Sequence, residues 1–144
     1  MGASANWSCM LFAIDCYIGW HWMPTNLPPN ARSLAYQLFI DSMASVGYTQ
    51  ENHLLTVFFY DWRRPLSENA EKLKSKIAEV RALTGSKKVH LVGHSMGGLV
   101  ARGYVQSADY NYDVDYLILV GSPNEGSAKA YTYWEGASLP GRPD

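Results

Sequence analysis

The chain has 144 residues, of which 47% are hydrophobic and 17% are charged, and its formal net charge is −1. That length suits a single domain over 1–144, and the composition is typical of a globular protein rather than a disordered one. A nearly neutral chain without a Lys- or Arg-rich run generates no field that would hold a polyanion, so we expect no nucleic-acid partner. The two cysteines, Cys9 and Cys16, do not match a zinc-ligand spacing, and we expect neither a metal nor a cofactor.

Membrane and targeting signals are weak. No uncharged apolar run approaches the roughly 20 residues that a membrane helix requires, so we expect no integral membrane segment. The apolar stretch 9–20 is interrupted by Asp15 and is not preceded by basic residues, which argues against a signal peptide. Whether the two cysteines pair is open, and the cellular compartment is therefore not predicted. We expect residues 1–30, which contain several Trp and Pro residues, to be irregular.

The first predicted elements alternate between helix and strand. Apolar residues recur at helical spacing from Leu34 to Val46, which predicts a helix that ends near Gly47. Residues 54–60 are rich in β-branched and aromatic residues and predict a buried strand. A second helix is predicted to begin at Ser67 as its N-cap and to stop at Gly85.

The alternation continues through the middle of the chain. Residues 89–92 predict a short strand, 96–105 a third helix, and 114–120 a further strand, while 124–144 is expected to be a loop or an excursion. Repeated strand–helix–strand units form right-handed crossovers and give a parallel sheet with helices on both faces. The predicted fold class is therefore α/β.

A motif lies between the strand 89–92 and the third helix. Gly93-His94-Ser95-Met96-Gly97 fits the G-x-S-x-G nucleophile elbow, in which a serine occupies a strained turn between a strand and a helix. Glycines at 93 and 97 avoid clashes with neighbouring backbone, and Gly98 keeps the first helical turn thin. Ser95 is the candidate nucleophile, at a helix N-terminus that favours developing negative charge, and the Met96 backbone N–H is the candidate oxyanion-hole donor. A nucleotide-binding turn would instead need glycine in place of Ser95.

Three blocks, taken together, resemble a known family. They are Tyr60-Asp61-Trp62-Arg63, the stretch 89–99 around the elbow, and the stretch 120–127. In this order they resemble the lecithin–cholesterol acyltransferase and lipase family of the α/β-hydrolase fold, over about residues 47–136. The resemblance implies a serine lipase, esterase or lipid acyltransferase whose substrate is a lipid or another apolar acyl ester.

The resemblance also suggests where a substrate would lie. Residues 121–134 are implied to leave the sheet near the active site and to begin a lid, which makes Tyr131, Tyr133 and Trp134 candidate acyl-contact residues, although a packing role is equally open. We interpret Asp61 and Arg63 as an ion-paired turn. Trp62 is expected to pack beside the elbow or, as the alternative, to contact the substrate.

The acid and the base of a catalytic triad are missing from the expected places. In this fold they follow the serine, whereas all histidines of the chain come before Ser95: His21, His53, His90 and His94. We expect His90 to be a satisfied core histidine, and His94 to be a poor base because neighbouring side chains diverge at the turn. Several acidic residues follow Ser95, but none lies after the later strand where, by the same resemblance, the acid of the family belongs: Asp109, Asp113, Asp115, Glu125 and Glu135.

Three interpretations of that absence remain open. The chain is a fragment of a longer hydrolase that lacks the C-terminal part of the fold, or it is a catalytically silent relative that binds apolar ligands or a partner. In the third, His21 or His53 serves as the base from an unusual position. An incomplete sheet would leave an edge exposed, and we expect self-association through that edge.

Overall fold

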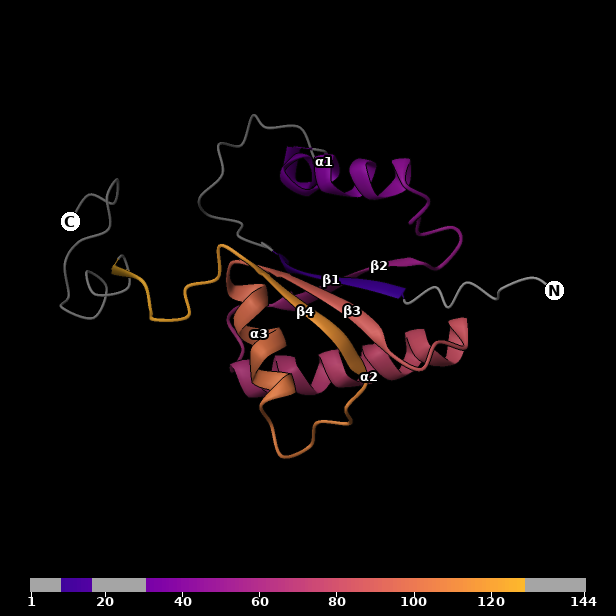
Figure 1. The fold of residues 1–144 in the computed structure, drawn as a ribbon. Helices are drawn as coiled ribbons and strands as arrows, with labels where there is room; N and C mark the ends of the chain where they lie inside the picture. Colours follow the sequence, from indigo (N-terminus) through magenta and orange to yellow (C-terminus); the bar gives the residue numbers. More distant parts are fainter. Residues whose placement is uncertain (1–8, 17–30, 129–144) are drawn as a thin grey trace.

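The computed structural model describes residues 9–16 and 31–128, which form a parallel sheet with helices on both faces. The strands are β1 (Cys9–Cys16), β2 (Leu55–Asp61), β3 (Val89–His94) and β4 (Val114–Val120), in the spatial order β2-β1-β3-β4. The helices are α1 (Ala31–Ser45), α2 (Leu66–Thr84) and α3 (Met96–Val105). Helix α1 covers one face of the sheet, while α2 and α3 cover the other (Figure 1). The mixture of helix and parallel strand agrees with the predicted α/β class.

Strand β1 corrects the expectation that residues 1–30 are irregular. It pairs in parallel with β2 on one side and with β3 on the other, so it lies inside the sheet. A parallel strand with helices over both faces is apolar throughout rather than alternating, and the run Cys-Met-Leu-Phe-Ala-Ile fits that pattern. The run is too short to distinguish a strand from a helix by periodicity, and the Trp and Pro residues around it obscured it. The rest of that segment lies outside the described residues.

The boundaries of α2 differ from the prediction at one end. The helix begins at Leu66 with Pro65 at its N-cap, and no side chain caps it. Ser67 therefore lies inside the first turn, and its predicted role as N-cap is wrong; the extended Pro65, with φ −50° and ψ 143°, already precedes the first helical residue. The other end agrees, because Gly85 has φ 71° and donates its N–H to the carbonyl of Arg81.

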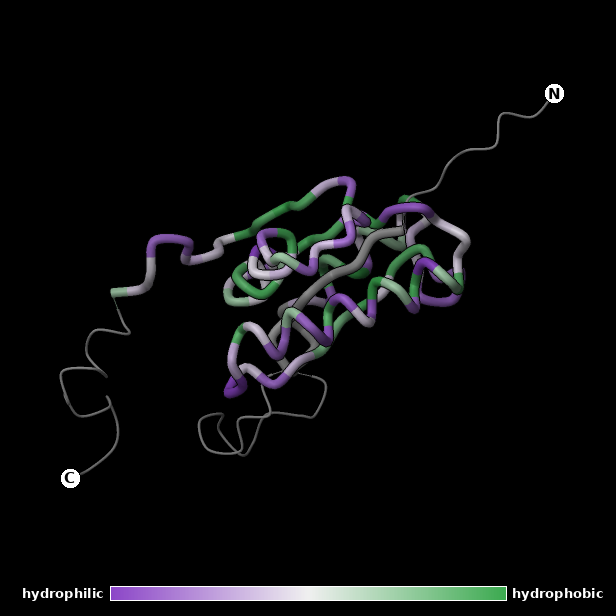
Figure 2. Tube along the Cα trace, turned by 90° about the horizontal axis from the view of Figure 1, so that it is seen from below, coloured by the Kyte–Doolittle hydropathy of each residue, from purple (hydrophilic) through white to green (hydrophobic). Residues whose placement is uncertain are grey.

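The core lies mainly between the sheet and the helices α2 and α3. Apolar residues spaced along α2 are nearly inaccessible: Ala70, Leu73, Ile77 and Val80. They pack with β3 through Val89 and Leu91, and with α3 through Val100 and Ala101. Val92 points to the opposite face, where it meets Tyr36 and Phe39 of α1. Figure 2 shows how hydrophobic and hydrophilic residues are distributed along the described chain.

A buried polar network joins α2, α3 and the start of β4. The Tyr104 hydroxyl donates to Asp113 Oδ1 at 2.7 Å, and Arg81 Nη1 approaches Asp113 Oδ2 at 3.4 Å. Tyr104 and Asp113 are each only 1% exposed. Burial, together with the hydrogen bond to Asp113, raises the pKa of Tyr104 well above its ordinary value. The phenol therefore remains a neutral donor to the buried carboxylate.

Removing that donor is expected to destabilise the fold. Tyr104→Phe should lower the free energy of unfolding by about 1–3 kcal/mol, because the Asp113 carboxylate stays buried with one partner fewer. Urea unfolding measures the change. Tyr112, which is 78% exposed, offers the matched control, and Tyr112→Phe should have little effect. A Tyr104→Phe variant as stable as the unaltered protein would contradict a stabilising role for the network.

Strand β4 lies at one side of the described sheet, and its surface is unusually apolar for an edge. Tyr116, Ile118 and Val120 share one face and are 64%, 46% and 46% exposed. An uncovered edge of this kind offers unpaired backbone groups to another strand. The expected self-association through it stays a prediction.

Candidate functional site

Ser95 is the single residue between β3, which ends at His94, and α3, which begins at Met96. Its backbone has φ 52° and ψ −126°, a region that residues with a side chain seldom occupy. Such a conformation costs about 1–3 kcal/mol and persists only where the surroundings hold it. The side chain is half-buried. The backbone at position 95 thus has the sharp strand-to-helix bend that the G-x-S-x-G motif requires.

Glycines make the bend sterically possible. A Cβ on Gly93 would lie 2.5 Å from the Cα and 2.7 Å from the backbone nitrogen of Gly98, closer than any side chain tolerates. A Cβ on Gly98 would overlap the hydroxyl of Ser122 and lie 2.8 Å from its Cβ. Gly97 is buried in the same turn. The end of β3 and the first turn of α3 are therefore packed backbone against backbone.

The bend lies where a ligand could reach it. The parallel strands have their carboxyl ends at the same edge of the sheet, where Cys16 pairs with Asp61 and His94 with Val120. Open α/β sheets bind ligands at this carboxyl edge. The first N–H groups of α3, including that of Met96, have no carbonyl partner within the helix, and the helix dipole adds partial positive charge there. The surroundings of Ser95 therefore suit a negatively charged oxygen.

The described histidines do not pair with the Ser95 hydroxyl. His94 turns toward α1, where its Nδ1 lies 3.4 Å from the Tyr36 hydroxyl and the two rings meet edge to face at 5.6 Å. His53 is exposed in the turn that precedes β2, at the amino edge of the sheet. Among the side chains that the structure describes, those of residues 36–128, none forms a hydrogen bond with Ser95 Oγ. His21 lies outside the described residues.

His90 differs from its expected character as a satisfied core histidine. Its ring lies 5.1 Å from that of Tyr116, and it is half-buried rather than buried. Its Nδ1 is inaccessible, yet it has no hydrogen-bond partner in the described part of the chain. His90 is only half-buried because it lies in β3 opposite Tyr116 of β4, the strand at one side of the described sheet.

The acidic residues after Ser95 are also not gathered around it. Asp109, Asp113 and Asp115 lie at the start of β4, and Val114 pairs with Val89 at the beginning of β3. The full length of a strand, about 20 Å for six residues, therefore separates them from the elbow. Glu125 is exposed beyond the carboxyl end of β4, and Glu135 lies outside the described residues. An acid and a base for Ser95 are thus not assigned among the described side chains.

The turn after β2 is ion-paired, as the sequence predicted. Arg63 Nε and Nη2 reach the two carboxylate oxygens of Asp61 at 2.8 Å each, and the Arg63 backbone N–H adds a third bond at 3.0 Å. These bonds hold the pKa of the Asp61 carboxyl far below its ordinary value. The buried amide of Asn69, which sequence reasoning missed, donates to the Asp61 carbonyl at 2.9 Å. An asparagine in the first turn of a helix that follows a charged turn is the sequence feature that could have indicated this bond to the backbone.

The aromatic residues proposed for substrate contact are only partly described. Trp62 is 42% exposed at the carboxyl end of β2. Because β1 lies between β2 and β3, the Trp62 backbone is at least two strand spacings, about 10 Å, from the elbow. Tyr131, Tyr133 and Trp134 lie outside the described residues, so their contacts with an acyl chain stay a prediction.

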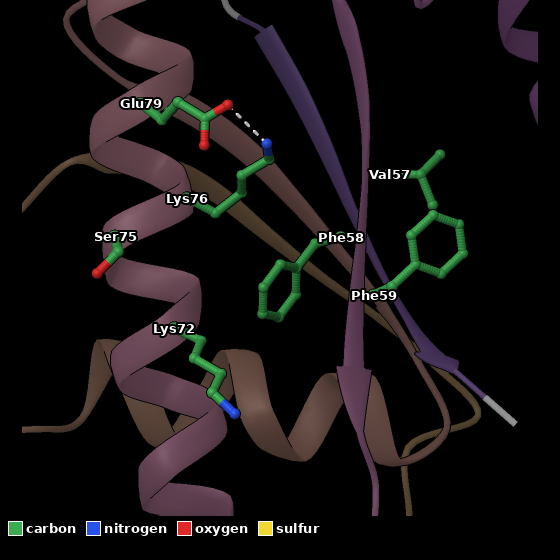
Figure 3. A pocket seen from close by; sticks show the side chains of 7 residues that line it. All are labelled: Val57, Phe58, Phe59, Lys72, Ser75, Lys76 and Glu79. Atoms are coloured by element: carbon green, nitrogen blue, oxygen red, sulfur yellow. Dashed lines mark hydrogen bonds and ion pairs between the residues drawn. The ribbon is translucent and has the colours of Figure 1, made fainter. Parts of the chain in front are cut away.

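A shallow pocket of about 430 Å³ lies elsewhere, between α2 and the outer strand β2 (Figure 3). Phe58 and Phe59 line one side, and the ion pair between Lys76 and Glu79, at 2.7 Å, lies on the other. None of its lining residues belongs to β3 or α3. This pocket is therefore separate from the elbow.

The fold and the bend define a parallel α/β protein in which a strained serine joins a central strand to a helix. The chain belongs to the lecithin:cholesterol acyltransferase family, whose profile matches residues 22–136. The resemblance drawn from the sequence is thereby confirmed. No helix within the described ranges is long and apolar enough to cross a membrane.

Two curated relatives were also found. An uncharacterized protein of Saccharomyces cerevisiae is 39% identical over 69 residues, which is 47% of this chain and 10% of that protein. A protein of Arabidopsis thaliana with the provisional name phospholipid:diacylglycerol acyltransferase 2 is 37% identical over 71 residues, which is 45% of this chain and 10% of that protein. The matched segments thus span only a tenth of the length of these relatives.

Proposed function

We propose that the protein is a serine enzyme of lipid ester chemistry, a lipase or a lipid acyltransferase, with Ser95 as its nucleophile. The positive φ of Ser95 at the junction of β3 and α3 carries the proposal, since backbone strain of this kind concentrates at functional sites. Membership in the lecithin:cholesterol acyltransferase family and similarity to a protein named as a phospholipid:diacylglycerol acyltransferase support a lipid substrate.

The proposed reaction has two acyl-transfer steps. Ser95 Oγ attacks the ester carbonyl carbon while a base takes its proton, and the Met96 N–H stabilises the oxyanion of the tetrahedral intermediate. Collapse of that intermediate breaks the bond to the alcohol, which leaves with the proton, and an acyl ester on Ser95 remains. Water or an acceptor alcohol then attacks this ester and regenerates the serine. The base and its orienting acid are to be sought outside the side chains described here.

The substrate-contact residues of this proposal are aromatic. Trp62 at the end of β2, together with Tyr131, Tyr133 and Trp134, would supply rings suited to an acyl chain at the carboxyl edge of the sheet. Aromatic side chains offer large apolar area and fit a ligand whose acyl tail must leave water.

The products distinguish the two reactions. The natural protein is incubated with vesicles of phosphatidylcholine carrying a labelled acyl chain, with and without diacylglycerol as the acceptor alcohol. We expect label in triacylglycerol if the protein is a transferase, and in free fatty acid if it is a hydrolase. If a protein shown to be folded releases neither triacylglycerol nor free fatty acid, the proposal is contradicted.

The second candidate is a catalytically silent module that binds apolar ligands or a partner. The observation that favours it is the lack of a described acid or base in contact with Ser95. In that case a fluorescent fatty acyl probe would bind equally well to the unaltered protein and to Ser95→Ala, and neither would release product.

A further inference from the structure

We propose that Ser122 is a positioning residue for Ser95, because its side chain fills the space that Gly98 leaves open and thereby fixes the first turn of α3. The inference rests on the proposed function and extends it to a residue from a different strand. Ser122 belongs to no part of the G-x-S-x-G motif and follows β4 by two residues.

The chain after β4 is turned back over the elbow. Gly121 has φ 60°, which directs the following residue toward α3. The half-buried Ser122 then places its side chain against Gly98, where any Cβ would overlap its hydroxyl. The same hydroxyl lies 3.5 Å from the carbonyl oxygen of Gly93. One side chain therefore contacts glycines on both sides of Ser95.

Neighbouring backbone contacts act in the same direction. The Ser95 N–H donates to the Val120 carbonyl at 2.9 Å, and the Gly98 N–H donates to the Ser95 carbonyl at 3.1 Å. Arg102 of α3 donates to Asn124 at 3.1 Å, which ties the segment beyond Ser122 to the same helix. Residues 120–124 thus hold the elbow from the β4 side.

These contacts explain how the strained serine is maintained. The unfavourable φ of Ser95 relaxes if the first turn of α3 can shift along β3. Gly93 and Gly98 already bring these segments into backbone contact, but glycines alone do not oppose a sliding motion. The Ser122 side chain occupies the remaining space and blocks it. We therefore expect the orientation of the Ser95 hydroxyl to depend on the combined volume at positions 98 and 122.

A graded set of variants in the natural protein tests this dependence. Gly98→Ala adds a methyl group that meets Ser122. In Gly98→Ala/Ser122→Ala the hydroxyl is gone but the Cβ remains at 2.8 Å, and in Gly98→Ala/Ser122→Gly both obstacles are gone. The nearest remaining neighbour of the methyl group is then the end of the Leu119 side chain, at 3.1 Å, which can rotate away. Ser122→Ala and Ser122→Gly are the matched single controls.

The rate of covalent labelling by a fluorophosphonate, measured well below the unfolding temperature, is the functional readout. We expect Gly98→Ala to lower the rate by about 100-fold, as a displacement of about 1 Å at a catalytic group does. The double variant Gly98→Ala/Ser122→Ala should recover part of the labelling rate. The labelling rate of Gly98→Ala/Ser122→Gly should approach that of Ser122→Gly alone. Ser122→Ala alone should lower kcat on a lipid ester while leaving KM unchanged, which a merely structural role would not do.

Several results would overturn the proposal. If the Gly98→Ala variant is labelled as fast as the unaltered protein, positions 98 and 122 do not compete for space. Double variants no faster than Gly98→Ala would show that the obstacle is not Ser122. If the unaltered protein does not label, or if Ser95→Ala still does, the proposed function fails instead. The unfolding temperatures of the same variants, measured by calorimetry, then test the steric contact by itself. We expect them to follow the order predicted for the labelling rates.

Discussion

Ser95→Ala is expected to lower turnover on lipid esters by at least about 10⁴-fold, because no acyl-enzyme forms without the hydroxyl. The stability of the fold should change little. The half-buried hydroxyl has no hydrogen-bond partner among the described side chains, and alanine meets the same backbone strain at φ 52°. A loss of activity in this variant would therefore be a chemical effect rather than an effect of unfolding.

Ser75→Ala is the matched control for that variant. Ser75 is an exposed serine of α2, remote from the elbow, and its hydroxyl donates to the Glu71 carbonyl within the same helix. Turnover and unfolding temperature of the control should match the unaltered protein. Substantial turnover by Ser95→Ala, with the same product, would show that Ser95 does not carry out the reaction.

Gly93→Ala is expected to be severe for both stability and activity. Its Cβ would lie 2.5 Å from the Cα of Gly98, and a collision between backbone atoms is not relieved by a rotamer change. Relief requires β3 and α3 to separate, which should cost about 1–3 kcal/mol or more of the free energy of unfolding. The same displacement moves Ser95, so labelling by a fluorophosphonate should fall by about 100-fold even where the protein is folded.

Gly103→Ala provides a demanding comparison for Gly93→Ala. Gly103 lies in α3, eight residues after Ser95, and a Cβ there would meet no atom of the described chain within 4 Å outside the adjacent backbone of its own helix. Alanine in an open helical position should stabilise the protein by about 0.5–1 kcal/mol, because glycine loses more backbone entropy on folding. Urea unfolding and labelling rates measure both variants. A Gly93→Ala protein that behaves like Gly103→Ala would show that the backbone contact at the elbow is not required.

The elbow could be predicted from the sequence because its determinants are local. A short apolar strand, three glycines and a helical pattern surround Ser95 within about a dozen residues, and each is recognisable alone. Strand β1 was missed because a buried parallel strand has no alternation to reveal it. Ser122 was missed for a different reason. Its proposed role rests on its close approach to Gly98, which is distant in sequence and adjacent only after β3 and β4 have paired.

The acid and the base illustrate the limit of local patterns in a different way. Sequence order already indicated that no histidine follows Ser95. The structure adds the geometric reason that the described acidic residues do not compensate, because Asp109, Asp113 and Asp115 lie at the amino end of β4. Asp113 is instead committed to Tyr104 and Arg81 in the core. A carboxylate held in that way stabilises the fold and is not available to orient a histidine.

Mapping the site of covalent attachment tests the role of Ser95 most directly. The natural protein is treated with a fluorophosphonate, digested with trypsin and examined by mass spectrometry. We predict one phosphonyl group on the peptide 89–102, which contains a single hydroxyl side chain, that of Ser95, and we predict that it disappears in Ser95→Ala. An adduct on a different serine, or no adduct on a protein shown to be folded, would contradict the assignment of Ser95 as the nucleophile.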